Sequence, residues 1–230
     1  MLRLSNVSRC VTPFLSMIAT AAVSACTSSS SGGYASGAAD VQVAQGSQAQ
    51  VLLGRTLVIN HDCSGCHGGS NPSDKGWLAG VMSPQQEFHI GPCSVENPTA
   101  KPCFITRPRN LTPDNATGLG RFSERQIFNA LRYGLRPEET PDVEITSTTP
   151  GQGNFPANPR YLAVPMPWPA WRHMSDQELR AIAAYLHRGL KPVSNKVLDS
   201  EGPPDFWASE YTVAKIGPFP SPAYPTANER

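Results

Sequence analysis

Apolar side chains recur at helical spacing in two segments, each with its own start and stop signals. The first follows Ser123, which begins a capping-box pattern, and ends at Gly134. The second follows Ser175, which begins the same pattern, and ends at Gly189. The apolar positions that share a face are Ile127, Ala130 and Leu131 in the first segment, and Leu179, Ile182, Ala183 and Leu186 in the second. We therefore predict two amphipathic helices.

A third helix is predicted over residues 51–60, which are largely apolar. Gly54 lies inside it, and glycine costs about 1 kcal/mol relative to alanine within a helix. We therefore expect another element to approach Gly54 closely. No pair of segments shows the alternation expected of paired strands, and the chain contains 23 prolines. The pattern predicts an all-α fold with long irregular loops.

The predicted helix at 51–60 leads into the motif Cys63-Ser-Gly-Cys66-His67. Two cysteines at this spacing can bond the two vinyl groups on one edge of a haem, and the adjacent imidazole can bind the iron. The motif therefore indicates one covalently attached haem c. Two alternatives stay open. A structural zinc site would need two further ligands at metal spacing, and a thioredoxin-like dithiol would need a βαβ pattern around it.

The second axial ligand is predicted to be Met166. An electron-transfer haem usually carries His and Met, and Met166 lies between two prolines that stiffen its backbone. Met174 precedes the cap of the last predicted helix, where a hydrophobic staple already explains it. Met82 follows the motif too closely to reach the opposite haem face readily. His89 is the alternative, since haems with two histidine ligands exist.

Arginine and aromatic side chains flank the inferred haem pocket. Arginine forms forked, charge-assisted bonds to carboxylates, so some arginines are expected to pair with haem propionates. The candidates are Arg107, Arg109, Arg121, Arg132 and Arg172. The aromatic residues that could line the pocket or bond a propionate, with core packing as the alternative role, are Trp168, Trp171 and Tyr161.

The first 25 residues resemble a secretory signal peptide. They combine early arginines with an apolar stretch that is too short for a membrane span and is interrupted by Pro13. The stretch ends at Cys26, in a sequence that resembles the lipobox of bacterial lipoproteins. We therefore expect a lipid anchor on Cys26, on the periplasmic side of a bacterial membrane. The alternative is ordinary cleavage that leaves Cys26 as a free thiol.

The rest of the chain divides by composition. Residues 26–50 are rich in Ser, Gly, Ala and Gln and are expected to form a flexible tether. Residues 51–195 form the expected haem domain, and residues 196–230 a Pro-rich tail. A formal net charge of +1 gives no case for nucleic-acid binding. In an exported protein, Cys93 and Cys103 are expected to form a disulfide, with two buried free thiols as the alternative.

Several short motifs occur together in one order, and with them residues 50–195 resemble a class I cytochrome c domain. Such domains are found in the cytochrome subunits of bacterial alcohol and gluconate dehydrogenases. The motifs are Cys63–His67, Asn110-Leu-Thr-Pro-Asp114, Gly118-Leu-Gly120, Met166-Pro-Trp168 and Ala184-Tyr-Leu186. Two features depart from the family. This chain has one haem motif where those subunits have several, and its segment 138–158 and the Pro-rich tail after Asp199 have no assigned counterpart.

The resemblance implies a cytochrome c-like fold with one haem between crossing N- and C-terminal helices. His67 and Met166 would bind the iron, and Gly54 would face Tyr185 at the helix crossing. A proline carbonyl, that of Pro92, would accept a hydrogen bond from the His67 ring.

Iron with two protein ligands has no open position, so the expected function is electron transfer rather than catalysis. The protein would exchange single electrons with redox protein partners at the membrane. If Met166 does not bind the iron, a five-coordinate haem could act as a peroxidase-like catalyst or a gas sensor. A third alternative is an assembly subunit whose haem is structural.

Overall fold

The computed structural model describes residues 48–81, 86–203 and 205–230. The predicted signal peptide, Cys26, most of the predicted tether and Met82 lie outside these residues. The helices are α1 (Gln48–Asn60), α2 (Cys63–His67), α3 (Glu124–Tyr133), α4 (Trp168–Trp171), α5 (Asp176–Ala184) and α6 (Val213–Ile216). Short 3-10 segments cover Leu119–Arg121, Pro137–Glu139 and Ala208–Tyr211, and a π-helical turn, Tyr185–Gly189, continues α5. In the described part of the chain, no helix has the length and apolarity needed to cross a membrane.

The three predicted helices are confirmed. α3 and α5 both begin with the predicted capping box, in which Ser123 and Ser175 accept from the backbone of Gln126 and Glu178. Gly134 ends α3 in the left-handed conformation. α1 begins at Gln48, inside the segment predicted to be tether. Its first turn is therefore part of the folded domain.

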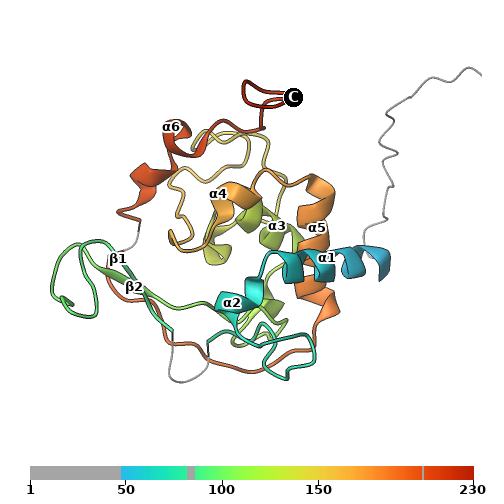
Figure 1. Cartoon of the computed structure of the whole chain (residues 1–230), viewed down its shortest axis with the longest axis vertical. Coiled ribbons are helices and arrows are strands. Elements are labelled where there is room, and N and C mark those ends of the chain that lie inside the picture. Colours follow the sequence, from blue (N-terminus) through green and yellow to red (C-terminus); the bar gives the residue numbers. More distant parts are fainter. Residues whose placement is uncertain (1–47, 82–85, 204) are drawn as a thin grey trace, which may run out of the picture. The chain divides into compact units, whose positions relative to one another are not determined.

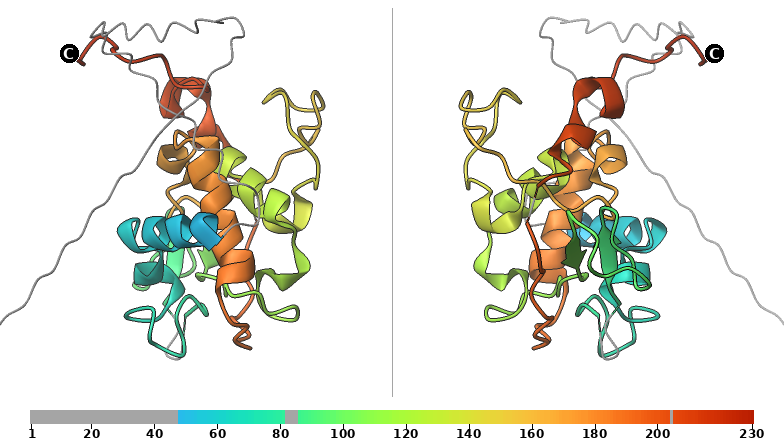
Figure 2. Two further views of the ribbon diagram at one scale, coloured as in Figure 1. Left: turned by 90° about the vertical axis from the view of Figure 1, so that its right-hand side faces the viewer. Right: turned by 90° about the vertical axis from the view of Figure 1, so that its left-hand side faces the viewer.

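α1 crosses α5 steeply, as Figures 1 and 2 show. The crossing point is Gly54, where a Cβ atom would lie 1.9 Å from the carbonyl oxygen of Ala181 and 2.8 Å from Cβ of Tyr185. Only glycine permits this approach, which accounts for its presence inside a helix. The main core forms around this crossing, and its fully buried members include Val58, Leu78 and Leu179.

A two-stranded antiparallel sheet, β1 (Phe88–Ile90) and β2 (Phe104–Thr106), was not predicted. Each strand has only three residues, which is too short for alternation to be recognised in the sequence. The expectation that no strands pair is wrong for this hairpin. The cytochrome c-like arrangement of the helices stays a prediction.

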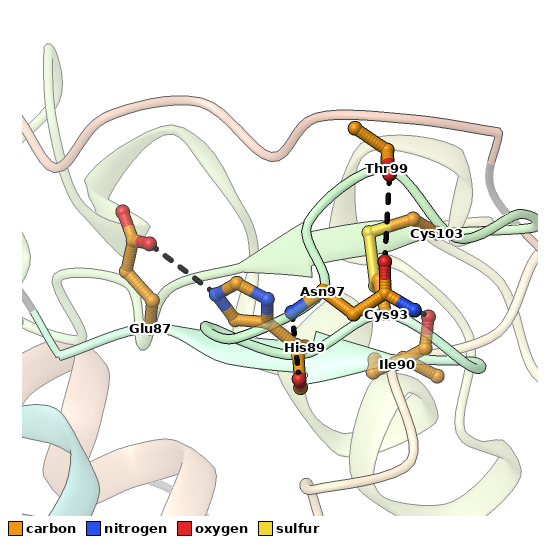
Figure 3. The surroundings of a disulfide bond; sticks show 8 residues. Glu87, His89, Ile90, Cys93, Asn97, Thr99 and Cys103 are labelled. Atoms are coloured by element: carbon orange, nitrogen blue, oxygen red, sulfur yellow. Dashed lines mark hydrogen bonds and ion pairs between the residues drawn. A yellow bond between two sulfur atoms is a disulfide. The ribbon is translucent and has the colours of Figure 1, made fainter.

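A disulfide between Cys93 and Cys103 closes the loop of the hairpin (Figure 3), which is the pairing expected from the sequence. Segment 138–158, which had no assigned counterpart, has a small core of its own. Ile145 and Phe155 are buried there with Leu135, and Tyr133 packs against them. This segment is therefore anchored to the end of α3.

Candidate functional site

The motif Cys63–His67 forms the short helix α2, and the chain that follows folds back against it. The amide of Leu78 donates to the Gly68 carbonyl (2.8 Å), and the amide of Gly80 donates to the His67 carbonyl (2.7 Å). Gly68 has a φ of 85°, and a Cβ there would meet the backbone of Gly80. These contacts fix α2 in place, and neither of its cysteines takes part in the disulfide.

His67 is held through one ring nitrogen, which leaves the other available. Its Nδ1 lies 2.7 Å from the carbonyl oxygen of Arg109. Because a carbonyl only accepts, Nδ1 carries the proton and Nε2 presents a lone pair suited to a metal. Burial lowers the pKa of His67, and the Arg109 carbonyl acts in the opposite direction with a smaller effect. A neutral imidazole in this tautomer is the form that binds iron.

The acceptor for His67 differs from the one implied by the resemblance. Pro92 lies in the loop of the disulfide hairpin, whereas the acceptor is Arg109, which follows Pro108. The expectation for Pro92 is therefore wrong. Arg109 is held in two ways. Asn110, the next residue in the chain, is buried, and the guanidinium of Arg109 bonds the C-terminal tail.

Cys63 does not resemble the reactive thiol of a redox dithiol. Burial, with the nearby Asp62 carboxylate as the second cause, raises the pKa of the Cys63 thiol to about 11. Reactive thiols have a lowered pKa, because the thiolate is the nucleophile. Cys66 borders an open hollow of about 260 Å³, so a group can approach the motif from that side.

The geometry also gives no support to a zinc site at α2. Among the described residues, the group of three or more potential ligands that converge is His89, Cys93 and Cys103. Cys63 and Cys66 are not part of it. Two of its members are bonded to each other in the disulfide, and His89 is 3.6 Å from the carboxylate of Glu87 (Figure 3).

Met166 lies in the loop before α4 and packs against the same core as Cys63 and Trp171. Two backbone bonds shape this loop, from the amide of Met166 to Ala163 (2.9 Å) and from the amide of Trp168 to Met166 (2.8 Å). The rings of His61 and Trp171 meet edge to face at 6.0 Å. This contact joins the turn before α2 to α4, which lies above α2 in Figure 1. The elements that carry the two predicted iron ligands are thus neighbours through the core.

All five candidate arginines have partners within the protein. Arg107 donates to Glu87 and Glu201, and Arg121 donates to Glu138. Arg109 donates to the tail, and Arg132 donates to Asp176 and to two backbone carbonyls. Arg172 donates through one terminal nitrogen to Gly217, while its buried Nε has no partner among the described residues. A carboxylate could satisfy this donor, so Arg172 is a candidate to pair with a haem propionate. The fit of the residues to haem c itself comes from Cys63, Cys66 and the orientation of His67.

One structural role was missed in the sequence. Asn110, which is 1 % exposed, donates to the carbonyl of Val193 (2.7 Å) and accepts from the amide of Thr112 (2.9 Å). It therefore joins the chain beside Arg109 to the segment after α5. The signal was present as an Asn-x-Thr pattern next to prolines, but its partner is a backbone atom far along the chain.

No family model matches the chain. It is 27 % identical over 161 residues to the gluconate 2-dehydrogenase cytochrome c subunit of Pantoea cypripedii, covering 69 % of this chain and 27 % of that protein. It is 25 % identical over 146 residues to the fructose dehydrogenase cytochrome subunit of Gluconobacter japonicus, covering 62 % and 22 %. It is 31 % identical over 96 residues to the alcohol dehydrogenase (quinone) cytochrome c subunit of Gluconobacter oxydans, covering 41 % and 16 %.

These relatives define a class of protein. All three are cytochrome subunits of dehydrogenases, and the likeness supports a cytochrome c-like family for this chain. Cytochrome c relatives imply haem c as the cofactor, and they are consistent with an electron carrier rather than a catalyst. The chain matches only about a quarter or less of each relative's length, so the likeness is to one part of those subunits.

Proposed function

We propose that the protein is a periplasmic c-type cytochrome with one haem, held at a bacterial membrane by a lipid on Cys26. It carries single electrons between a respiratory dehydrogenase or similar complex and an acceptor. The observation that carries the proposal is the geometry of α2. Its two cysteines, which lie outside the Cys93–Cys103 disulfide, stand beside an imidazole whose Nδ1 is fixed by the Arg109 carbonyl.

Each residue has a defined part in this function. Cys63 and Cys66 attach the haem edge, His67 binds the iron through Nε2, and Met166 supplies the second ligand. When bound, the haem supplies a reversible one-electron couple. The bond from Nδ1 to Arg109 holds the imidazole ring in one orientation through both oxidation states. Cys63 and Met166 both pack against the apolar main core, which lowers the polarity on that side of the iron ligands.

The first experiment tests the cofactor. The full chain is produced in a host with working cytochrome maturation, and the mass of the exported protein is measured. We expect an increment of one haem in the wild type and none in Cys63→Ala/Cys66→Ala. A colourless wild-type protein without the increment would overturn the proposal.

The second experiment tests the ligand that separates electron transfer from catalysis. Met166→Ala should abolish the weak Met–iron band at the red end of the ferric spectrum, while the matched change Met174→Ala should keep it. His89→Ala is also expected to keep the band. A wild-type protein without this band that reacts rapidly with peroxide would favour the five-coordinate alternative. Failure of any membrane donor to reduce the haem would favour a structural haem.

The third experiment tests the anchor. Cys26→Ser should release the cytochrome from the membrane fraction into the soluble periplasm, whereas the wild type should require detergent. A wild-type protein that leaves the membrane in buffer alone would contradict lipid attachment. That result would leave the haem assignment intact.

A further inference from the structure

The C-terminal tail contacts the segment that holds His67. After α5, Asn195 donates to the Ala79 carbonyl (2.8 Å), and Val197 is buried with 4 % exposed. The guanidinium of Arg109 donates to the carbonyls of Val197 (3.3 Å) and Leu198 (3.2 Å). Since the Arg109 carbonyl accepts from His67, the tail holds the residue that orients this ligand.

The tail then pairs with the hairpin. Glu201 and Ile105 exchange two backbone hydrogen bonds of 2.9 Å each. The buried Arg107 side chain donates to the Glu201 carboxylate (2.8 Å). Trp207, which is 2 % exposed, packs on Phe104 with ring centroids 4.8 Å apart. The disulfide hairpin thus gives the tail a fixed support on its way from α5 towards α6, a course that can be followed in Figure 1.

The tail finally packs on the loop that carries Met166. The hydroxyl of Tyr211 donates to the Leu162 carbonyl (3.0 Å), and its ring meets Trp168 edge to face at 4.9 Å. The same ring meets Tyr161 at 5.4 Å, and Tyr161 stacks on Trp168. Tyr211 therefore touches the chain on both sides of Met166.

A second tail residue fixes the start of this loop. The Asp205 carboxylate accepts from the backbone amide of Tyr161 (3.2 Å) and from Nε of Arg160 (3.0 Å). Further along, Gly217 accepts from Arg172, the residue that follows α4. The loop is thus held at its beginning, along its length and beyond its end.

We propose that the tail is a clamp on both iron-ligand segments and that Tyr211 is the positioning residue for Met166. The inference rests on the proposed function. Tyr211 does not touch the iron; it acts by holding the Leu162 carbonyl and the Trp168 ring in place. Burial raises the pKa of the Tyr211 phenol, so the hydroxyl remains a donor well above neutral pH.

The test is Tyr211→Phe in the full-length haem protein, because this change keeps the ring and removes only the hydroxyl. Losing one such bond should lower the equilibrium ratio of the Met-ligated form to the form without Met on iron about two- to tenfold. The pH at which the Met–iron band disappears should therefore fall by up to about one unit. Amide hydrogen exchange over residues 160–168 should become faster by a similar factor.

Tyr133→Phe is the matched control. The Tyr133 hydroxyl donates to the Ile145 carbonyl at the same distance, 3.0 Å, and burial also raises its pKa. Its ring shares a cluster with Tyr161, and the change to Phe keeps that ring; the hydroxyl that is removed bonds Ile145 in segment 138–158. We expect the control to leave the band's pH midpoint and the exchange of residues 160–168 unchanged.

The outcomes separate the two proposals. A wild-type protein without a Met–iron band refutes Met166 as ligand and, with it, both the carrier proposed with Met166 on the iron and the positioning role of Tyr211. A wild-type band with equal pH midpoints in Tyr211→Phe, Tyr133→Phe and wild type refutes the clamp alone. If the pH midpoint of the band shifts equally in both variants, the shift reflects a general loss of stability and the positioning role of Tyr211 is wrong. If Tyr211→Phe fails to fold, Asp205→Gly, which removes the side-chain oxygen that accepts from the Tyr161 amide and suits the φ of 66° at this position, must lower the midpoint for the clamp to stand.

Discussion

Gly54→Ala should destabilise the protein although alanine is the better helix former. In an exposed helix the change would stabilise by about 1 kcal/mol. Here the added Cβ would lie 1.9 Å from the carbonyl oxygen of Ala181, whereas ordinary contacts begin at 3.4 Å. Both neighbours belong to α5 and its continuation, because the other close atom is Cβ of Tyr185 at 2.8 Å. Neither can rotate away.

The magnitude follows from the movement that the clash requires. α1 and α5 would have to separate by more than an ångström at the centre of the main core, which would loosen the contacts of Val58 and Leu179. Overpacking of a close-packed core costs typically about 1–3 kcal/mol, and a clash with backbone belongs at the upper end. After the gain in helix propensity, we expect a net loss of roughly 2 kcal/mol in the free energy of unfolding.

The assay is denaturant unfolding of the haem protein, followed by circular dichroism. Gly76→Ala is the control, since its Cβ would meet nothing closer than an Asp74 oxygen at 3.5 Å. The control should stay within about 0.5 kcal/mol of wild type. A Gly54→Ala protein as stable as the wild type, or more stable, would refute the close crossing of α1 and α5.

Three further predictions concern stability. Hydrogen bonds from Thr117 hold the pKa of Asp114 below its usual range, so this carboxylate stabilises the fold above its unfolded pKa, and that stabilisation is lost as pH falls through the folded pKa. Asp114→Asn should therefore flatten the acid side of the pH–stability profile measured by unfolding, and an unchanged profile would contradict this. Cys93→Ser opens the loop of the hairpin, whose cysteines are 10 residues apart, and should lower the free energy of unfolding by roughly 2–3 kcal/mol. The same loss on reduction of the wild type would show that the disulfide is the cause, and no loss would contradict this. Ser175→Ala removes the cap of α5 and should cost about 1 kcal/mol in the same assay, while a change below the error would show that Glu178 caps the helix alone.

The parts of the fold that could be predicted are those fixed by neighbours in sequence. A capping box is a relation between residues three apart, so Ser123 and Ser175 marked two helix starts correctly. The haem motif is equally local. Gly54 was informative because a glycine inside a helix often marks a place where another backbone comes close, and the structure gives it a packing partner in α5.

The parts that could not be predicted depend on backbone atoms and on distant segments. The acceptor for His67 is a carbonyl 42 residues away, and any residue type can supply a carbonyl. The hairpin depends on pairing between three-residue strands, which carry no periodic signal. Tyr211 and Asp205 lie in the segment predicted only as a Pro-rich tail, and their partners are 49 and 44 residues earlier in the chain.

The wide separation in sequence of the crossing helices also has a consequence for how the protein is made. Trp77 donates to the Tyr185 hydroxyl across 108 residues of chain, so the core around α1 cannot close until the chain has been made as far as the end of α5. In a chain exported as proposed, Cys63 and Cys66 would therefore stay accessible to the maturation machinery until α5 has emerged. Because α5 is made after the haem motif, haem attachment could take place before the core closes.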